Sequence, residues 1–347
     1  MQTLTHSRLS SYRTCPMKHH LRYDLGLVPD RTPTYFRFGT AWHLCQELID
    51  GDYVTALHDN YANPPDWVQE DATALRAWLY EPATVLTLFN AYQIHYATDP
   101  VEVIAAEKEF RIPILNPETS RPSPVFNFAG KIDKLARWQG REVIMEYKTT
   151  ADDIGPDSEY WLRLRIDTQI SGYLMAARAL GHNPEAVLYD VVRKPTIRPH
   201  DVPLTDALGV IVLGPDGQRV YTKSGEPRKT SDSKSGYVVQ TRPETIPEWS
   251  DRLAADIASR PDWYFQRREI PRLASELTLY AAELWDIQQQ IRESQRHQRH
   301  YRNTAACRTV TGCCEYFGLC TSGADPASVP PGYRVETIHK ELTNVTN

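Results

Sequence analysis

Long hydrophobic stretches are missing from this chain of 347 residues. No apolar run approaches the roughly 20 residues that a membrane-spanning helix needs. The N-terminus, MQTLTHSRLSSYR, has no apolar segment of the kind found in signal peptides, and no internal repeat is visible. With 41% hydrophobic residues the chain can still bury a substantial core. We therefore expect a soluble, cytoplasmic, globular protein with no membrane partner.

A net excess of positive charge is also missing, since the formal net charge is -5. This overall value argues against nucleic-acid binding, but the local values differ. Residues 1–40 carry six Lys or Arg against two acidic residues, and residues 288–310 carry five Arg against Glu293. Residues 51–100 hold seven acidic residues against Arg76. The basic ends leave room for a nucleic-acid groove, although solvated helix faces produce the same pattern.

Cysteines are few, and most of them are clustered. Four of the six lie within fourteen residues, in CRTVTGCCEYFGLC. In a cytoplasmic chain such a cluster favours metal binding over disulfides. Four local thiols could hold zinc, but adjacent residues such as Cys313 and Cys314 seldom reach one ion together. Alternatively, three of the four could join Cys15 around an iron-sulphur cluster and so connect the two ends of the chain.

Residues 125–150, VFNFAGKIDKLARWQGREVIMEYKTT, predict a β-hairpin with its turn at Gln139-Gly140. With a two-residue loop, facing positions sum to 279, so that Asp133 stands opposite Glu146. Side chains alternate along a strand, which places Lys148 on the same face as these two carboxylates.

Two facing carboxylates, with Cβ atoms about 4.5–5.5 Å apart, destabilise a sheet unless a positive charge lies between them. A divalent cation would supply that charge, and hard oxygen ligands suit Mg²⁺ or Mn²⁺. Lys148 could then contact a scissile phosphate. In the alternative reading, Asp133 and Glu146 pair diagonally with Lys131 and Lys148 in a plain ionic ladder.

Further helices and strands are expected on both sides of this hairpin in the sequence. The patterns predict helices over residues 5–25, 36–50, 66–95, 157–181, 247–259 and 271–300, strands over 101–115 and 187–192, and turns over 196–245 with a hairpin near Asp216-Gly217. Pro16 interrupts the first helix and leaves Cys15 at a helix junction, and the second helix is expected to begin just after Gly39. His43 reads either as a ligand or as a structural partner of Glu47. Glu107 reads either as an outer metal carboxylate or as an edge-strand surface residue.

Taken in order, several short motifs resemble one known family. The chain is similar to the RecB-like branch of the PD-(D/E)XK nucleases that carry an iron-sulphur cluster, which includes CRISPR adaptation nucleases and phage or nuclease-helicase relatives. The resemblance covers about Ser7 to Cys320. It is carried by Cys15-Pro16, Gly39 and His43 (GxxxH), Gly130 and Asp133 (GxxD), Glu146 and Lys148 (ExK), Gln169 and Tyr173 (QxxxY), and the C-terminal cysteines.

The resemblance implies an α/β fold, with a central mixed sheet flanked by helices and the chain ends joined at a metal cluster. It implies one domain over residues 1–347, with these parts: a core over about 36–195, an insertion or flexible hairpin over 196–245, helical segments over 1–35 and 246–320 at the cluster, and a tail over 321–347.

The resemblance also implies roles for single residues. It implies a Mg²⁺- or Mn²⁺-dependent DNA exonuclease that acts on single strands or ends in recombination, repair or phage DNA processing, with a helicase as a further partner. The implied roles are as follows: catalysis for Asp133, Glu146 and Lys148; metal ligation for His43, Asp133, Glu146 and the Tyr147 carbonyl; substrate contact or support for Gln169, Tyr173 and Glu107; and ligation of a 4Fe-4S cluster for Cys15, Cys307, Cys314 and Cys320.

The chain departs from the family pattern at two places. Cys313 and Cys314 stand where relatives usually have one cysteine; CEYFGLC reproduces the family spacing and favours Cys314, with Cys313 as the alternative. Ile132 replaces the proline of the family name, as is common in the RecB-like branch. The rival functions are a non-catalytic iron-sulphur module that binds DNA ends and a structural zinc protein.

Overall fold

The computed structural model describes residues 1–30, 34–309, 312–339 and 342. The chain divides into two compact units. The first unit comprises Met1–Tyr53, Tyr96–Arg193 and Phe265–Asn347, and the second comprises Val54–His95 and Lys194–Tyr264. Within the described ranges, no helix combines the length and the apolar character needed to cross a membrane.

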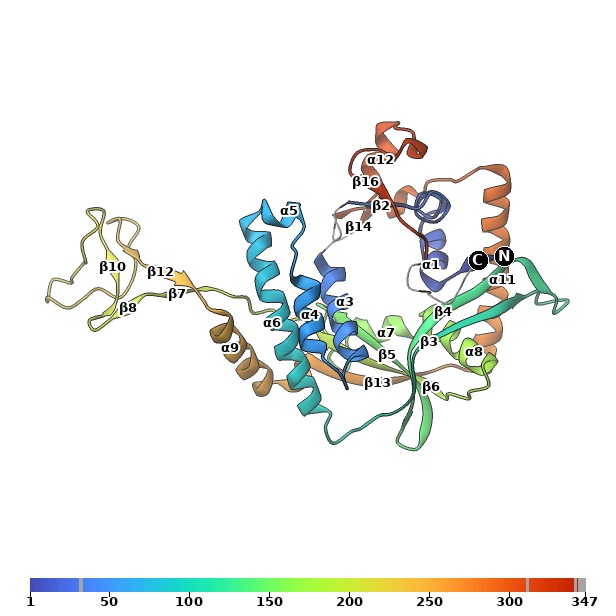
Figure 1. Ribbon diagram of the computed structural model, residues 1–347, viewed down its shortest axis with the longest axis horizontal. Coiled ribbons are helices and arrows are strands. Elements are labelled where there is room, and N and C mark those ends of the chain that lie inside the picture. The colour runs from blue at the N-terminus through green and yellow to red at the C-terminus, as the bar shows by residue number, and fades with distance from the viewer. Residues whose placement is uncertain (31–33, 310–311, 340–341, 343–347) are drawn as a thin grey trace. The chain divides into compact units, whose positions relative to one another are not determined.

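A six-stranded mixed sheet forms the centre of the first unit (Figure 1). Its order is β1-β4-β5-β6-β13, with β3 added on β4. The pairs β1–β4 and β5–β6 are parallel and the others are antiparallel. The strands are β1 (Gln2–Leu4), β3 (Glu102–Leu115), β4 (Pro122–Trp138), β5 (Arg141–Thr150), β6 (Ala186–Arg193) and β13 (Phe265–Pro271). The predicted α/β class with a central mixed sheet is confirmed.

The β4–β5 hairpin has the predicted turn. Gln139 and Gly140 both have positive φ values, 50° and 80°, as a tight two-residue hairpin turn requires. Lys134 pairs with Met145 and Trp138 pairs with Arg141, so facing positions sum to 279 as predicted. Asp133, one residue beyond this ladder, contacts β5 through its side chain instead of its backbone.

Helices cover both faces of this sheet. On one face, apolar side chains such as Phe128, Leu135 and Ile144 pack in a continuous core with residues from four helices. These are α1 (His6–Thr14), α7 (Glu159–Leu164), α8 (Thr168–Ala179) and α11 (Ala274–His297). On the other face, α3 (Thr34–Glu47) contacts the sheet. Lys134 Nζ of β4 donates a hydrogen bond to the Gln46 carbonyl of α3 at 3.2 Å.

Gly130, the glycine of the predicted GxxD motif, is explained by packing. A Cβ atom at this position would lie 2.9 Å from the Phe110 ring, so a larger residue would push β3 and β4 apart. The glycine therefore allows β3 and β4 to pack closely at a position three residues before Asp133.

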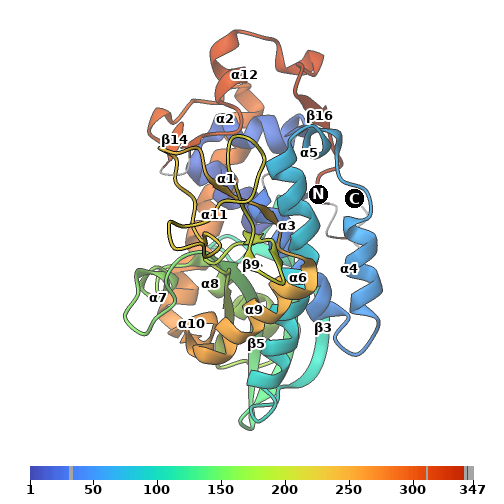
Figure 2. The ribbon, with the colours of Figure 1, turned by 90° about the vertical axis from the view of Figure 1, so that its left-hand side faces the viewer.

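Segments from both ends of the chain lie side by side in the first unit (Figures 1 and 2). Strand β2 pairs antiparallel with β16, and Leu21, Leu27, Tyr316 and Leu319 form a small core there. The elements are α2 (Pro16–His19), the π-helix η1 (His20–Asp24), β2 (Leu27–Pro29), η2 (Thr304–Ala306), β14 (Arg308–Thr309), β15 (Gly312–Cys313), α12 (Phe317–Ser322), η3 (Pro326–Ser328) and β16 (Tyr333–Val335).

The second unit combines helices with short strands. Trp249 of α9 is buried, and its Nε1 donates to Thr84 of α6 at 3.0 Å. The predicted turn near Asp216-Gly217 is present, with Gly217 at φ 74° and Gly214 N–H donating to the Gln218 carbonyl. The elements are α4 (Tyr53–Tyr61), α5 (Asp66–Gln69), α6 (Ala72–His95), β7 (Asp201–Pro203), β8 (Thr205–Asp206), β9 (Gly209–Val210), β10 (Val212–Leu213), β11 (Val238–Val239), β12 (Thr241–Pro243), α9 (Ile246–Ser259) and α10 (Pro261–Tyr264).

Several predicted helices have different bounds in the structure; the helix expected over 66–95, for example, is divided into α5 and α6. The helix expected after Gly39 already begins at Thr34. The helix expected over 157–181 is two helices, α7 and α8, because Asp167 ends the connection between them and caps α8 by accepting from Gln169 N–H. The helix expected over 271–300 begins at Ala274, after the strand β13, which the prediction missed; Leu273, expected on its apolar side, is 70% exposed.

Candidate active site

Asp133 lies where β4 and β5 diverge. Its Oδ2 accepts a hydrogen bond from the Tyr147 N–H at 3.0 Å. The Nδ1 atom of His43, in α3, lies 3.7 Å from the same oxygen. The carboxylate is thus oriented by one strand and one helix, and two of the predicted site residues, His43 and Asp133, are in contact.

Glu146 is a buried carboxylate with an incomplete set of partners. It is 2% exposed. Its Oε1 contacts the Lys148 ammonium, whereas Oε2 is buried and has no hydrogen-bond partner. Burial and the nearby Asp133 charge raise its pKa to about 8, although Lys148 acts in the opposite direction. A buried carboxylate oxygen without a donor is costly, and a bound cation would relieve that cost.

Lys148 begins a chain of hydrogen bonds that leads into α8. Its Nζ donates to Gln169 Oε1 at 3.2 Å, and Gln169 Nε2 donates to the Tyr173 hydroxyl at 2.9 Å. Burial acts to lower the Lys148 pKa, but the charges of Glu146 and Asp133 outweigh it and raise the pKa. Lys148 is therefore a cation whose position is fixed by two partners, with 32% of its side chain exposed.

Glu107 lies on β3 at a position with unusual backbone. Its φ is 49°, a left-handed conformation that side chains other than glycine rarely adopt. Its carboxylate pairs with Lys131 of β4. The observed partner of Lys131 is thus Glu107, and Glu146 pairs with Lys148 on its own strand instead of diagonally across the hairpin as the ionic ladder predicts.

The predicted metal ligands lie near one another, but they do not form a compact set of ligand atoms. In the part of the chain that the structure describes, His43, Asp133 and Glu146 do not offer three ligand atoms that all lie within 4.8 Å of one another. Lys148 holds one Glu146 oxygen. The donor set of two carboxylates and one imidazole nevertheless suits Mg²⁺ or Mn²⁺, and the partnerless Glu146 Oε2 provides a vacant ligand atom.

Three further residues border this site, and the sequence patterns did not single them out. Burial lowers the His6 pKa to about 4, and the charge of Lys148 adds to this effect while that of Asp167 opposes it. Tyr160 of α7 is buried and also interacts electrostatically with Lys148. Of the three, Asp167 carried a usable signal, because an Asp directly before a helical run is a typical N-cap.

The cysteines line a cavity of about 220 Å³ in the terminal segments of the first unit. Arg302 and Lys18 also line it and place positive charge near the thiols. The cavity brings together the four thiols predicted as cluster ligands and the alternative fifth: Cys15, Cys307, Cys313, Cys314 and Cys320. Cys45 is buried in α3 and does not line the cavity.

Individual contacts around the thiols suit thiolate ligands. Asn303 N–H donates to Cys15 Sγ at 3.3 Å, which is a hydrogen bond of the kind that stabilises ligating sulphur. Burial raises the Cys320 pKa, and the charges of Cys15 and Cys307 add to the effect, as expected where thiols crowd together. Cys314 packs with Cys320 on the small terminal core, whereas Cys313 is exposed. This donor set fits a four-thiolate metal group.

One known protein family matches most of the chain. The family model of the PD-(D/E)XK nuclease superfamily matches residues 3–321. A search of curated proteins finds no match. A solved structure, described as a crystal structure of SSO0001, is 15% identical over 74% of this chain and 75% of that chain. Its TM-score is 0.25, so this likeness supports no argument about the chain.

Proposed function

Because the chain belongs to the PD-(D/E)XK nuclease superfamily, we propose that it is a Mg²⁺- or Mn²⁺-dependent DNA exonuclease of the RecB-like, iron-sulphur branch. It would hydrolyse phosphodiester bonds in single strands or at DNA ends, in the cytoplasm, during recombination, repair or phage DNA processing. The catalytic part of this proposal rests on Glu146. Its carboxylate is buried, has one oxygen without a hydrogen-bond partner, lies near Asp133 and contacts Lys148.

The proposed roles follow from the contacts of each side chain. His43, Asp133, Glu146 and the Tyr147 carbonyl would hold the ion, which when bound supplies Lewis acidity and offsets charge on the leaving oxygen. Lys148, fixed by Glu146 and Gln169, would orient the attacking water and contact the scissile phosphate. Tyr173 would hold Gln169 in place through their 2.9 Å hydrogen bond.

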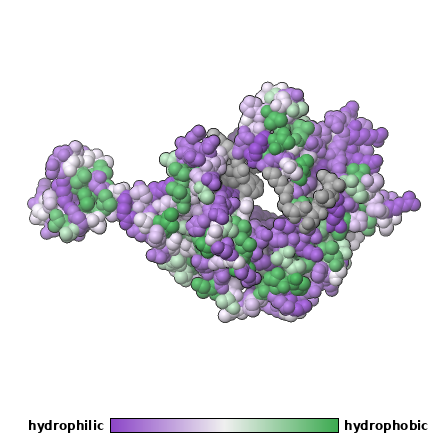
Figure 3. Space-filling view, viewed as in Figure 1, coloured by the Kyte–Doolittle hydropathy of each residue, from purple (hydrophilic) through white to green (hydrophobic). Residues whose placement is uncertain are grey.

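Two features support DNA as the polymer. Basic residues at the C-terminal end of α11 are exposed: Arg292, Arg296 and Arg299. Figure 3 shows a mainly hydrophilic surface where this end of α11 lies. Such side chains can neutralise phosphates without regard to base sequence, as an exonuclease requires.

The cysteine cavity would hold a 4Fe-4S cluster through Cys15, Cys307, Cys314 and Cys320. Cys314 is preferred to Cys313 because Cys314 packs against the same terminal core as Cys320, whereas Cys313 is exposed. When bound, the cluster would join segments that are about 290 residues apart in sequence, which restricts the unfolded chain. The proposed role is structural support for α1, whose last residue precedes Cys15.

Digestion of end-labelled DNA tests the proposed activity. Linear single-stranded and double-stranded DNA should be shortened from an end in Mg²⁺ or Mn²⁺, and covalently closed circles should survive. EDTA should abolish cleavage. Binding without any cleavage would instead support the rival DNA-end binding module, and cleavage of closed circles would overturn the exonuclease mode.

The raised Glu146 pKa predicts an unusual pH dependence of stability for the metal-free protein. A carboxyl whose pKa rises from 4.5 in the unfolded chain to about 8 in the fold binds its proton more tightly when folded. Stability should therefore fall as pH rises between these values. Glu146→Gln cannot ionise, so in EDTA its Tm should fall less than that of the wild type between pH 5 and pH 8.

Thermal unfolding in EDTA and in Mn²⁺ checks this prediction. Mn²⁺ should stabilise the wild type and leave Glu146→Gln nearly unchanged, because the variant lacks the proposed ligand. A wild-type Tm that falls no more than that of the variant between pH 5 and pH 8 in EDTA would contradict the assignment of Glu146 as the group with the raised pKa.

The Lys148–Gln169–Tyr173 chain predicts graded effects on the chemical step. Gln169→Leu removes the acceptor that positions Lys148 and should slow single-turnover cleavage by about 10–100-fold, as small misplacements of reacting groups do. Tyr173→Phe leaves the Gln169 acceptor intact and should have a smaller effect. DNA affinity should change little in either variant. Equal cleavage rates in Gln169→Leu and the wild type would show that the contact between Gln169 and Lys148 does not contribute to the mechanism.

A further inference from the structure

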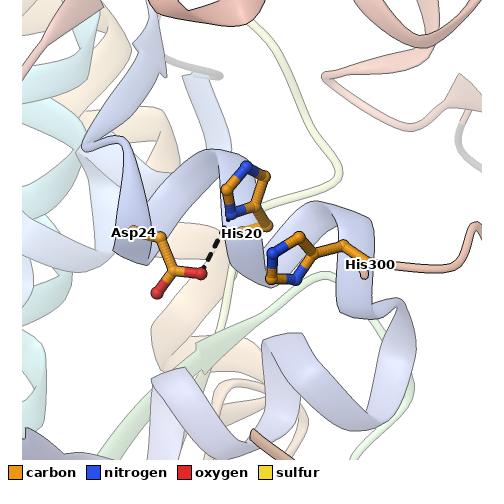
Figure 4. Close-up of side chains that lie close together, drawn as sticks. All are labelled: His20, Asp24 and His300. Atoms are coloured by element: carbon orange, nitrogen blue, oxygen red, sulfur yellow. Dashed lines mark hydrogen bonds and ion pairs between the residues drawn. The ribbon is translucent and has the colours of Figure 1, made fainter. Parts of the chain in front are cut away.

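A second group of potential metal ligands lies outside the site described above. His20, Asp24 and His300 each offer one ligand atom, and these atoms all lie within 4.8 Å of one another (Figure 4). Among the residues that the structure describes, no other three His, Cys, Asp or Glu side chains offer ligand atoms this close together. All three residues are partly buried.

The local backbone places His20 and Asp24 on the same side of one turn. They are the first and last residues of η1, and His20 Nδ1 lies 3.0 Å from Asp24 Oδ2. A π-helical turn is rare and often marks a functional site. Two ligands of a tetrahedral ion, at about 2.1 Å each, are about 3.4 Å apart. The His20–Asp24 pair, at 3.0 Å, is close to that spacing.

His300 comes from the segment that follows α11, and backbone contacts hold this segment against the N-terminal helices. Met17 N–H donates to the Tyr301 carbonyl at 3.1 Å, and Asn303 Nδ2 donates to the Thr14 carbonyl at 2.8 Å. The His300 ring stacks on His20, with centroids 3.8 Å apart and planes 11° from parallel. The three side chains are thus brought together by the fold around them.

Both ring nitrogens of His300 are buried and lack hydrogen-bond partners. A buried imidazole normally satisfies at least one nitrogen, because leaving a polar group unpaired is costly. Packing alone does not explain why a histidine occupies this position.

The carboxylate has the supporting contacts of a metal ligand. Gln295 Nε2 donates to Asp24 Oδ1 at 2.8 Å, which leaves Oδ2 directed at His20. Arg8 lies 3.6 Å from Oδ1, but its hydrogen bonds go to His19 and to the Thr3 carbonyl. The arginine therefore does not occupy the oxygen that faces the histidines.

We propose that His20, Asp24 and His300 form a binding site for a Zn²⁺-class ion, separate from the catalytic site and from the cysteine cavity. Two imidazoles and one carboxylate suit borderline divalent metals such as Zn²⁺ or Co²⁺ better than Mg²⁺. The ion would join η1 to the segment after α11 and would hold the two chain ends together independently of the thiols. The ligand atoms all lie within 4.8 Å of one another, and ligands of a tetrahedral zinc ion lie about 3.4 Å apart.

Cadmium-113 NMR can isolate this site, because sulphur ligands and nitrogen or oxygen ligands give well-separated signals. The experiment uses the full-length Glu146→Gln protein in excess Mg²⁺, so that the proposed catalytic site does not compete for cadmium. We expect one signal of the nitrogen-oxygen type per chain. His300→Phe, which keeps the ring stack and removes both nitrogens, should abolish it and weaken Zn²⁺ binding at this site by about 100-fold or more.

His297→Phe is the matched control, since it removes an exposed histidine three residues away and should leave the signal intact. A nitrogen-oxygen signal that persists in His300→Phe, or no such signal in the parent protein, would overturn the proposal. If His300→Phe does not fold, ring ¹⁵N shifts decide in the parent protein. Zn²⁺ should shift one nitrogen each of His20 and His300, and unchanged shifts at both would overturn the site.

Discussion

Glu146→Gln is expected to bind DNA with near wild-type affinity and to cleave it at least about 10³-fold more slowly. The substitution keeps the shape of the side chain but removes the charge that the proposed cation needs. It also removes the ionic partner that positions Lys148. The loss should therefore appear in the rate of the chemical step at saturating enzyme, with binding measured separately by fluorescence anisotropy.

Glu142→Gln provides the matched control. Glu142 lies on the same strand, β5, and accepts a hydrogen bond from Asn183 N–H. An amide oxygen can replace that acceptor, so cleavage should be unchanged. Metal-dependent cleavage by purified Glu146→Gln at the wild-type rate would show that hydrolysis does not use this carboxylate.

Cys15→Ser is expected to lose the bound iron, together with the visible absorption of an iron-sulphur cluster, and much of the stability of the protein. Cys15 is the proposed ligand from the N-terminal segment, and the other three come from residues 307–320. By analogy with a disulfide that closes a long loop, losing this connection should cost about 2–4 kcal/mol. The Tm should then fall by about 3–5 °C.

Cys45→Ala is the control for Cys15→Ser, because it also removes a buried thiol but one outside the cavity. It should retain iron and colour. Cys314→Ser should behave like Cys15→Ser, and Cys313→Ser should retain the cluster. Full iron content in Cys15→Ser would refute a cluster that includes the N-terminal thiol, and iron loss in Cys313→Ser alone would move the third ligand to that residue.

The hairpin could be predicted from the sequence because its signals are local. Gln139-Gly140 fixes the turn, and the turn fixes the pairing of Lys134 with Met145 through a count of residues. The contact between Asp133 and the Tyr147 N–H could not be read in the same way. It depends on where the ladder ends, which is a property of the surrounding sheet.

Strand β13 shows why some elements escape sequence patterns. Its residues Arg267 and Glu269 are charged, so the stretch does not read as a buried strand. In the fold, Arg267 pairs with the fully buried Asp190 of β6 and with Asp99. Buried charges are tolerated where they are paired, and a partner 77 residues away leaves no trace in the local pattern.

The same reasoning applies to the residues around Lys148. His6 comes from α1, far away in sequence, and it borders the site only because β1 and α1 pack on β4 and α8. His20 and His300 are likewise 280 residues apart and stack only in the fold. Tertiary placement, which short patterns do not encode, assembles these groups.

The central claim is that Asp133 and Glu146 hold a divalent cation, and anomalous diffraction from a crystal soaked in Mn²⁺ tests it most directly. The account predicts an anomalous peak between the two carboxylates, within ligand distance of His43, with Glu146 Oε2 turned toward it. A crystal with no peak at this position, and with Glu146 still held by Lys148 alone, would contradict the account.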